Sequence, residues 1–323
     1  MSPCNGGNMR NDCGFGKISL TIKGRGINEN EKKQFYSFWE RIKSASIVYR
    51  GVDGNYLRRI YNADASNIPL LSELLFLYGE KGKAFCDEMN FDNNINNSER
   101  ICFESILNNL QKSFLDSTSN NRSVNNRMPT FLQENQAIIE DILSCNANDW
   151  CKKIDALPQI IKSAIKDYYM SFLHTIGKSG YGNYSYFLST TKEESVAEYF
   201  RNNDEKNGAI IIGWSNGKGI KCSNSLGLRD VVSKYGFPTF KTPFYSKQNE
   251  ITYKCGLLPH FIVGFHYHDG FEINPYILKI NDMAKVRKEG LPVDQTDFIK
   301  KLSKTNYKSY YDVCDCFYWQ QSV

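Results

Sequence analysis

The chain is 323 residues long, enough to bury a substantial hydrophobic core in one elaborated domain or in two smaller ones. Hydrophobic residues make up 41% and charged residues 23% of the sequence, ordinary values for a globular protein that exclude a globally disordered chain. The formal net charge of +5 favours acidic partners without demanding that the partner be a nucleic acid.

The sequence begins with MSPCNGGNMR, which lacks the apolar stretch of a secretory signal. No later run approaches the roughly 18 consecutive apolar residues that can span a membrane. We therefore expect a cytoplasmic protein with no membrane partner.

Cysteines and histidines are the first candidates for a metal site. The ten cysteines lack the C-x-x-C spacing of a zinc site, which favours reduced and mostly buried thiols. Cys314 and Cys316 flank Asp315, and His266 and His268 share one side of an extended segment. Neither group has visible further ligands, so we expect no metal.

The first half of the chain predicts one strand followed by helices. Residues 47–52, IVYRGV, are β-branched and aromatic and end at the turn signal Asp53-Gly54, which predicts a strand carrying one arginine. From about residue 68 to residue 170, apolar residues recur at helical spacing. The predicted helices are IPLLSELLFLYG, ERICFESILNNLQKSFL, FLQENQAIIEDIL and ALPQIIKSAIKDYYMSFL. Asparagine- and serine-rich stretches, DNNINNS and STSNNRSVNNR, predict loops between them.

Strand-like segments return after Gly177. The order is a strand, YSYFLSTT, a helix, EESVAEYF, and then the strands GAIIIGW, EITYKCGLL and HFIVGFHYH. The tail adds a strand candidate, PYILKI, and a lysine-rich helix candidate, DFIKKLSK. The second half is therefore expected to be rich in sheet.

Three of these segments carry polar motifs in a suggestive order. Tyr-Arg-Gly occupies 49–51 on the first strand, Ser-Thr-Thr occupies 189–191 at the end of another, and YSKQNE occupies 245–250 before a third. In this order they resemble the Arg-Ser-Glu class of mono-ADP-ribosyltransferases, the family of many bacterial ADP-ribosylating toxins. In that family an aromatic-arginine strand precedes a Ser-Thr-Ser type motif with a helix and then a Gln/Glu-x-Glu substrate loop.

The resemblance implies that NAD is the co-substrate and assigns roles to the motif residues. Glu250 would be catalytic, stabilising the oxocarbenium-like cation that forms as nicotinamide leaves the ribose. Arg50 would bind the cofactor phosphates, for which a planar, permanently charged guanidinium is suited. Ser189 would orient Glu250 and line the nicotinamide pocket. The implied cofactor-binding set is completed by Gly51, Thr190 and Thr191.

The substrate loop bears on the acceptor of ADP-ribose. Gln248 lies two residues before Glu250, so on an extended segment both side chains point the same way, and the resemblance gives Gln248 a catalytic and substrate-binding role. A glutamate here accompanies arginine modification in the family, so glutamine disfavours an arginine acceptor. The glutamine form is similar to Rho-modifying exoenzymes, which modify asparagine, and to pierisin-like enzymes, which modify guanine. Tyr245 would contact a protein target or stack on a base.

By the same resemblance, we expect an α+β fold of two packed, antiparallel-rich β-sheets around an NAD cleft, with a large helical insertion. Residues 1–62 would hold the Arg strand, residues 63–175 the helical insertion, and residues 176–323 the main sheet with the other two motifs. The stretch between Arg50 and Ser189 is longer than the family usually has. The insertion could be a substrate-recognition module, a lid or a docking surface.

The function expected from the resemblance is transfer of ADP-ribose to a macromolecular acceptor, either a protein side chain or a nucleic-acid base. A toxin, effector or defence role implies a neutralising antitoxin or immunity protein and action in the cytosol of a target cell. Two alternatives stay open. One is a catalytically inactive module that binds NAD or a partner on the same fold, and the other is an NAD glycohydrolase, in which water captures the cation.

Overall fold

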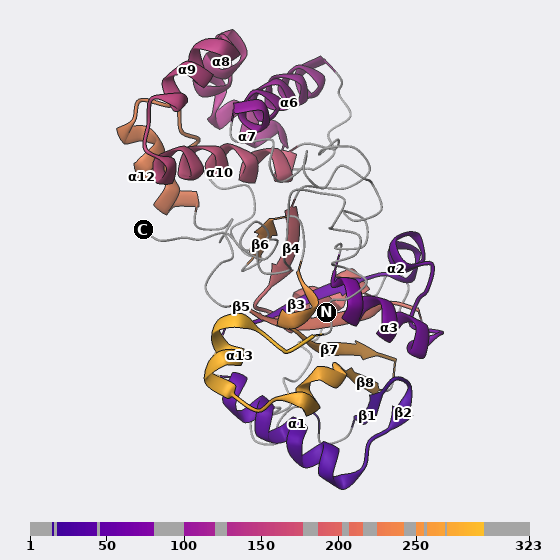
Figure 1. Cartoon of the computed structure of the whole chain (residues 1–323). Helices are drawn as coiled ribbons and strands as arrows, with labels where there is room; N and C mark the ends of the chain where they lie inside the picture. The colour runs from indigo at the N-terminus through magenta and orange to yellow at the C-terminus, as the bar shows by residue number, and fades with distance from the viewer. Residues whose placement is uncertain are drawn as a thin grey trace, which may run out of the picture. The chain divides into compact units, whose positions relative to one another are not determined.

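The computed structural model describes Phe15 and residues 18–43, 46–80, 100–119, 128–176, 187–201, 207–215, 225–241, 250–254, 257–268 and 270–293. These residues form helices together with a mixed β-sheet, which confirms the α+β class (Figure 1). They fall into two compact units, each drawn from three stretches of chain. The first unit draws on Met1–Lys83, Thr190–Gly217 and Gly256–Lys301, and the second on Ala84–Ser189, Lys218–Cys255 and Leu302–Val323.

The described strands join in one order, β2-β1-β8-β7-β5-β3-β4-β6. Their bounds are β1 Ser19–Ile22, β2 Arg25–Gly26, β3 Ser46–Val52, β4 Phe187–Thr191, β5 Ala209–Ser215, β6 Glu250–Lys254, β7 Ile262–Tyr267 and β8 Gly270–Ile273. β1 pairs in parallel with β8, whereas the pairs β1–β2, β3–β4, β3–β5, β5–β7 and β7–β8 are antiparallel. The antiparallel character was expected, but hydrogen bonding links these strands into one sheet where two had been expected.

The centre of the first unit is β5, whose apolar run is buried on both faces. Ile210, Ile211 and Ile212 are each 2% exposed or less. An uninterrupted apolar run is typical of a strand covered on both sides, and β5 pairs with β3 on one edge and β7 on the other. This arrangement holds the Arg-bearing strand against the middle of the hydrophobic core.

The described helices of the first unit are α1 Glu29–Ile42, α2 Gly54–Tyr61, α3 Ile68–Tyr78, α11 Glu194–Arg201 and α13 Met283–Glu289. Of these, α1, α2, α3 and α13 begin at side-chain caps. Asp53 accepts a hydrogen bond from the Tyr56 backbone N–H at 2.7 Å, so the Asp53-Gly54 turn signal marks the start of α2. On α1, Phe35, Phe38 and Ile42 form the buried stripe that helical spacing predicts.

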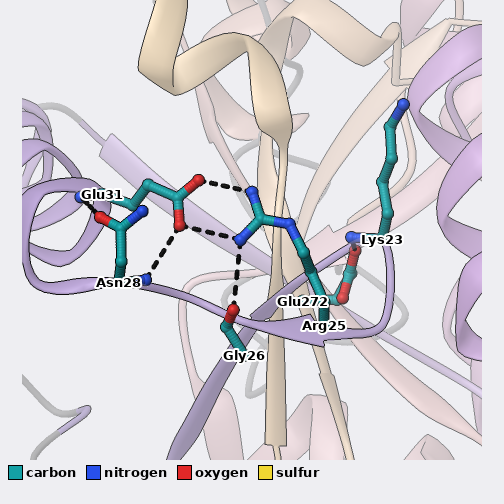
Figure 2. Close-up of polar contacts among 6 residues, drawn as sticks. All are labelled: Lys23, Arg25, Gly26, Asn28, Glu31 and Glu272. Atoms are coloured by element: carbon teal, nitrogen blue, oxygen red, sulfur yellow. Dashed lines mark hydrogen bonds and ion pairs between the residues drawn. The ribbon is translucent and has the colours of Figure 1, made fainter.

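A network of polar contacts precedes α1 (Figure 2). The Asn28 side chain accepts from the Glu31 N–H at 2.9 Å and the Glu31 carboxylate accepts from the Asn28 N–H at 2.9 Å, which forms a capping box. Arg25 binds the same carboxylate with both terminal nitrogens, at 2.9 and 2.5 Å. The Arg25 hydrogen bond, helped by the Asn28 N–H, lowers the pKa of Glu31 to about 2.

A fully buried carboxylate, Glu272 on β8, joins the β1–β2 turn to β8 and α3. Thr21 Oγ1 donates to it at 2.7 Å, Ser72 Oγ at 2.8 Å and the Gly24 N–H at 3.2 Å. The Lys23 N–H is a fourth donor, and Figure 2 shows Lys23 beside Glu272. Because the desolvated carboxylate is surrounded by donors, its burial is compensated. Glu272 therefore anchors the edge of the sheet.

The described part of the second unit is largely helical. Its described helices are α6 Arg100–Ser119, α7 Met128–Glu134, α8 Gln136–Ser144, α9 Ala147–Asp155, α10 Gln159–Ile176 and α12 Ser225–Lys234. The ring of Phe240, just after α12, lies 4.1 Å from that of Phe172 on α10, measured between centroids. The Phe240 N–H donates to the Tyr168 hydroxyl at 2.6 Å, and the Lys241 N–H donates to Asn135 Oδ1 at 2.7 Å. Residues after α12 thus complete the helical core.

Two sequence predictions about elements were wrong. PYILKI was expected to be a strand, but Pro275–Lys279 is a 3-10 helix, η4, because Pro275 opens the turn and the Asn274 side chain accepts from the Tyr276 N–H at 3.1 Å. FLQENQAIIEDIL was expected to be one helix but divides into α7 and α8 at Asn135, whose side-chain amide donates to the Phe131 carbonyl at 2.8 Å. The expected helix DFIKKLSK lies outside the described residues.

Candidate functional site

The motif residues lie on three strands. Tyr49, Arg50 and Gly51 lie on β3; Ser189, Thr190 and Thr191 end β4; Glu250 begins β6. Tyr245 and Gln248 lie outside the described residues. The strand context expected for each of the three motifs is therefore present.

These three strands are consecutive in the strand order, β3-β4-β6. Tyr49 on β3 pairs directly with Thr191 on β4. Along the chain, the boundary between the two units falls within β4, between Ser189 and Thr190; Arg50 belongs to the first unit and Glu250 to the second.

Arg50 is held by a buried carboxylate that the sequence analysis did not identify. Its Nε donates to Glu80 Oε1 at 2.8 Å; the Arg50 side chain is 16% exposed and that of Glu80 is fully buried. The Tyr56 hydroxyl donates to the same carboxylate oxygen at 2.7 Å, and the Arg50 guanidinium carbon lies 5.3 Å from the Tyr56 ring centroid. Arg50 is therefore part of an ordered polar cluster.

The other oxygen of Glu80 is also bound. Tyr61 donates from its hydroxyl to Glu80 Oε2 at 2.9 Å and lies 2.7 Å from the Gly79 carbonyl. Burial alone would lower the pKa of Arg50, but Tyr56 and Glu80 outweigh it and raise that pKa. Burial, reinforced by the negative charge of Glu80, raises the pKa of Tyr56. Arg50 thus stays charged and Tyr56 neutral at ordinary pH.

Gly51 allows α11 to approach β3. A Cβ atom at this position would lie 1.7 Å from the Ala197 carbonyl oxygen, far inside van der Waals contact. No side chain fits here without moving the helix. The structure therefore shows a packing role for Gly51, beside the cofactor-binding role that the resemblance implies.

The Ser-Thr-Thr motif joins the end of β4 to the start of α11. Thr191 Oγ1 accepts a hydrogen bond from the Glu193 N–H at 3.0 Å, and Thr190 and Thr191 are 4% and 5% exposed. Ser189 is half-buried. Thr191 accordingly orients the helix that packs on Gly51, which places the second motif next to the first along the β3–β4 pair.

Glu250 is a buried carboxylate at the first position of β6, with 6% of its surface exposed. Removing a carboxylate from water is costly unless partners compensate it, so few side chains of this type occupy such positions by chance. Its burial suits a carboxylate that must act in a water-poor site.

A second titratable cluster in the first unit was not identified from the sequence. His266 Nε2 on β7 lies 4.0 Å from a carboxylate oxygen of Glu194 on α11. Burial, with a further contribution from Arg201, lowers the pKa of His266 to about 4, so at neutral pH the ring is uncharged and the contact is not an ion pair. Burial, then Glu194, raises the pKa of Tyr49 to about 12.

No group of three or more potential metal ligands occurs among the residues that the structure describes. Cys145 and Cys151 are free thiols. Within the described part of the chain, none of the helices is both long and apolar enough to cross a membrane.

Comparisons with protein-family models, with curated proteins and with solved structures find no match to this chain. A functional assignment must therefore come from the chemistry and placement of its own residues.

Proposed function

We propose that this chain is an NAD-dependent mono-ADP-ribosyltransferase of the Arg-Ser-Glu class, built on an ADP-ribosyltransferase-like fold. The observation that carries this proposal is the strand order: the three motif-bearing strands, far apart in sequence, are consecutive neighbours, β3-β4-β6. Residues that share a reaction centre must come from neighbouring elements, and unrelated motif matches have no reason to do so.

Glu250 is the proposed catalytic carboxylate. Loss of nicotinamide leaves positive charge on the ribose, and a fixed carboxylate stabilises that charge best where water is scarce. Glu250 is only 6% exposed, so little water surrounds its carboxylate. Gln248, two residues before it in the sequence, is the residue to which the resemblance gives a catalytic and substrate-binding role beside Glu250.

Arg50 is the proposed ligand of the NAD phosphates. A guanidinium bound at Nε by a carboxylate is a fixed, permanently charged donor, which suits a pyrophosphate. Ser189, Thr190 and Thr191 lie at the end of β4, the strand that pairs with the Arg50 strand β3. By resemblance, the nicotinamide end of NAD would lie beside these three residues. The donor set therefore fits an anionic dinucleotide.

The acceptor is proposed to be a macromolecule other than an arginine side chain. Gln248 offers an amide, which can both donate and accept hydrogen bonds but supplies no charge to hold a guanidinium. A protein amide side chain and a nucleobase edge both match such a group. A neutralising partner protein and a toxin or defence setting follow only if transfer is demonstrated.

The test uses NAD labelled in its adenylate phosphate, incubated with the purified protein and a cell extract, after which protein and nucleic acid are separated. Glu250→Gln keeps the shape of the side chain and removes its charge, so transfer should fall by about a hundredfold or more, as for loss of one transition-state contact. Glu140→Gln, which changes an exposed carboxylate of α8 in the same unit, is the matched control and should retain activity.

The outcomes separate the alternatives. Label in protein or in nucleic acid that depends on Glu250 supports transfer and identifies the acceptor class. NAD consumption without label in either fraction would replace the transferase by an NAD glycohydrolase. Intact NAD across several extracts would overturn the enzyme proposal in favour of a binding module.

A further inference from the structure

The Glu80 cluster is an ordered polar arrangement around Arg50, a residue of the proposed site. Three donors converge on the Glu80 carboxylate: the Arg50 guanidinium and the Tyr56 hydroxyl at one oxygen, and the Tyr61 hydroxyl at the other. We propose that Glu80 is a positioning residue for Arg50, setting the direction in which the guanidinium meets the NAD phosphates, an assignment that rests on the proposed function.

The position of the Glu80 backbone is fixed independently of Arg50. Glu80 and Leu257 form an antiparallel bridge, with hydrogen bonds of 2.8 and 3.1 Å in the two directions. The preceding Gly79 has a φ of 73°, and a Cβ there would lie 2.3 Å from the Leu257 carbonyl oxygen. Since only glycine fits this conformation and this space, the carboxylate projects from a rigid point of the first unit.

The hydrogen bond to Nε controls the orientation of the whole guanidinium. The group is planar, so fixing Nε against Glu80 Oε1 and the plane over Tyr56 fixes the direction of the edge formed by the two terminal nitrogens. That edge is the one that binds phosphate in a bidentate manner. Without Glu80, the long side chain could take several rotamers and would have to be ordered by the ligand.

The cluster differs from that of Glu272, whose donors are backbone N–H groups and Ser and Thr hydroxyls, because Glu80 also holds a guanidinium. A buried ion pair is often no more stabilising than apolar residues of the same size, so the pairing of Glu80 with Arg50 is better explained by the orientation it gives the guanidinium than by stability. The free energy needed to remove Arg50 from water is already included in the free energy of folding. NAD therefore binds to a side chain that is already dry and oriented.

The test compares the steady-state parameters for NAD of the wild type with those of Glu80→Gln. The variant keeps the side-chain volume but weakens the hydrogen bond to Arg50, so KM for NAD should rise roughly tenfold, the factor for one weakened charge-assisted hydrogen bond, while kcat changes by less than about threefold. Asp64→Asn is the matched control, because Asp64 is a buried acidic partner of Arg58 in the same unit and does not contact Arg50. Its KM should match the wild type.

Tyr61→Phe tests the same idea with a milder change. It removes the donor to Glu80 Oε2 and leaves the bond between Arg50 and Oε1 in place, so KM should rise by less than in Glu80→Gln. Comparable KM increases in the Asp64 control would mean that general destabilisation, not positioning, explains the effect.

NMR tests whether Glu80 holds the Arg50 side chain, and this test does not depend on enzymatic activity. In the folded wild type, the Arg50 Nε–H should give a signal that exchanges slowly with water, and Glu80→Gln should lose it or accelerate its exchange at least tenfold, since that proton is held by a buried carboxylate. An unchanged exchange rate, or an unchanged KM in an active enzyme, overturns the positioning role. If Arg50 is ordered through Glu80 but the wild type neither binds nor consumes NAD, the proposed function fails and the positioning role for NAD falls with it.

Discussion

At the scale of single residues, the protein buries several carboxylate side chains. Glu80, Glu272 and Glu250 are each 6% exposed or less. Glu272 receives donors from a turn and a helix and has a structural explanation, whereas Glu80 binds a residue of the proposed site. The same fold therefore uses one buried carboxylate as an anchor and another beside the candidate chemistry.

His266 should make stability depend on pH between about 4 and 6.5. Its pKa is lowered to about 4 in the folded protein, so over this window the unfolded chain binds a proton that the folded chain does not, and stability falls as pH falls. From pH 7 to pH 5 the wild type should lose about 1–2 kcal/mol more than His266→Phe, which cannot titrate and keeps the ring contacts with Phe15 and Phe271.

Urea unfolding at the two pH values measures this difference directly. A wild type and variant with parallel pH dependence would show that His266 is protonated as readily in the fold as in the unfolded chain, and the burial argument would be wrong for this residue.

At the scale of elements, the contact between α11 and β3 is the packing that links two of the motifs. Gly51→Ala should destabilise the first unit by about 1–3 kcal/mol or more, since the new methyl group would lie 1.7 Å from the Ala197 carbonyl oxygen and would push α11 away. Thermal unfolding followed by circular dichroism measures the loss. Gly26→Ala is the control, because nothing lies within 4 Å of the added Cβ, and it should shift the melting temperature little. Equal melting temperatures for the two variants would contradict the close approach.

Much of the element pattern could be predicted because it depends on local periodicity. The strand of IVYRGV, the buried run of β5 and the helices α3, α6 and α10 follow from apolar spacing alone. PYILKI was predicted wrongly because an apolar run with a proline fits both a strand and a short helix. The Asn274 side chain caps the turn at the Tyr276 N–H, and its amide also donates to the Pro259 and Ile262 carbonyls, contacts that the apolar pattern does not indicate.

The candidate site could be predicted only where its residues form motifs. Arg50, Ser189 and Glu250 stood out because they sit in recognisable strings at strand positions. Glu80 did not, because it meets Arg50 only through folding across 30 residues of sequence. The sequence shows an acidic residue directly after the apolar helix segment LLFLYG, but glutamate at a helix end is usually exposed, so this position alone does not indicate a buried partner of Arg50.

At the scale of the whole molecule, the chain crosses between its two units several times, and the motif residues are divided between them. Arg50 and Thr191 belong to the first unit, and Ser189 and Glu250 to the second. Sequence patterns cannot show such interleaving, because each crossing depends on which distant segments pack together. The helical core is completed by residues 237–241, which follow the motif strand β4 by about 50 residues.

Phe240→Ala should therefore lower the proposed activity by destabilising the helical core. Phe240 is 2% exposed and contacts the rings of Phe172, Phe131, Phe114 and Tyr168, so its truncation should cost the second unit about 3–5 kcal/mol.

Hydrogen exchange should show reduced protection in α6 and α10 and smaller changes in β5 and β7 of the first unit. Because Ser189 and Glu250 belong to the weakened unit, transferase activity measured against temperature should fall with the melting of the helices. Activity that outlasts this melting, while the β5 and β7 amides stay protected, would place the whole reaction centre in the first unit and remove Glu250 from it.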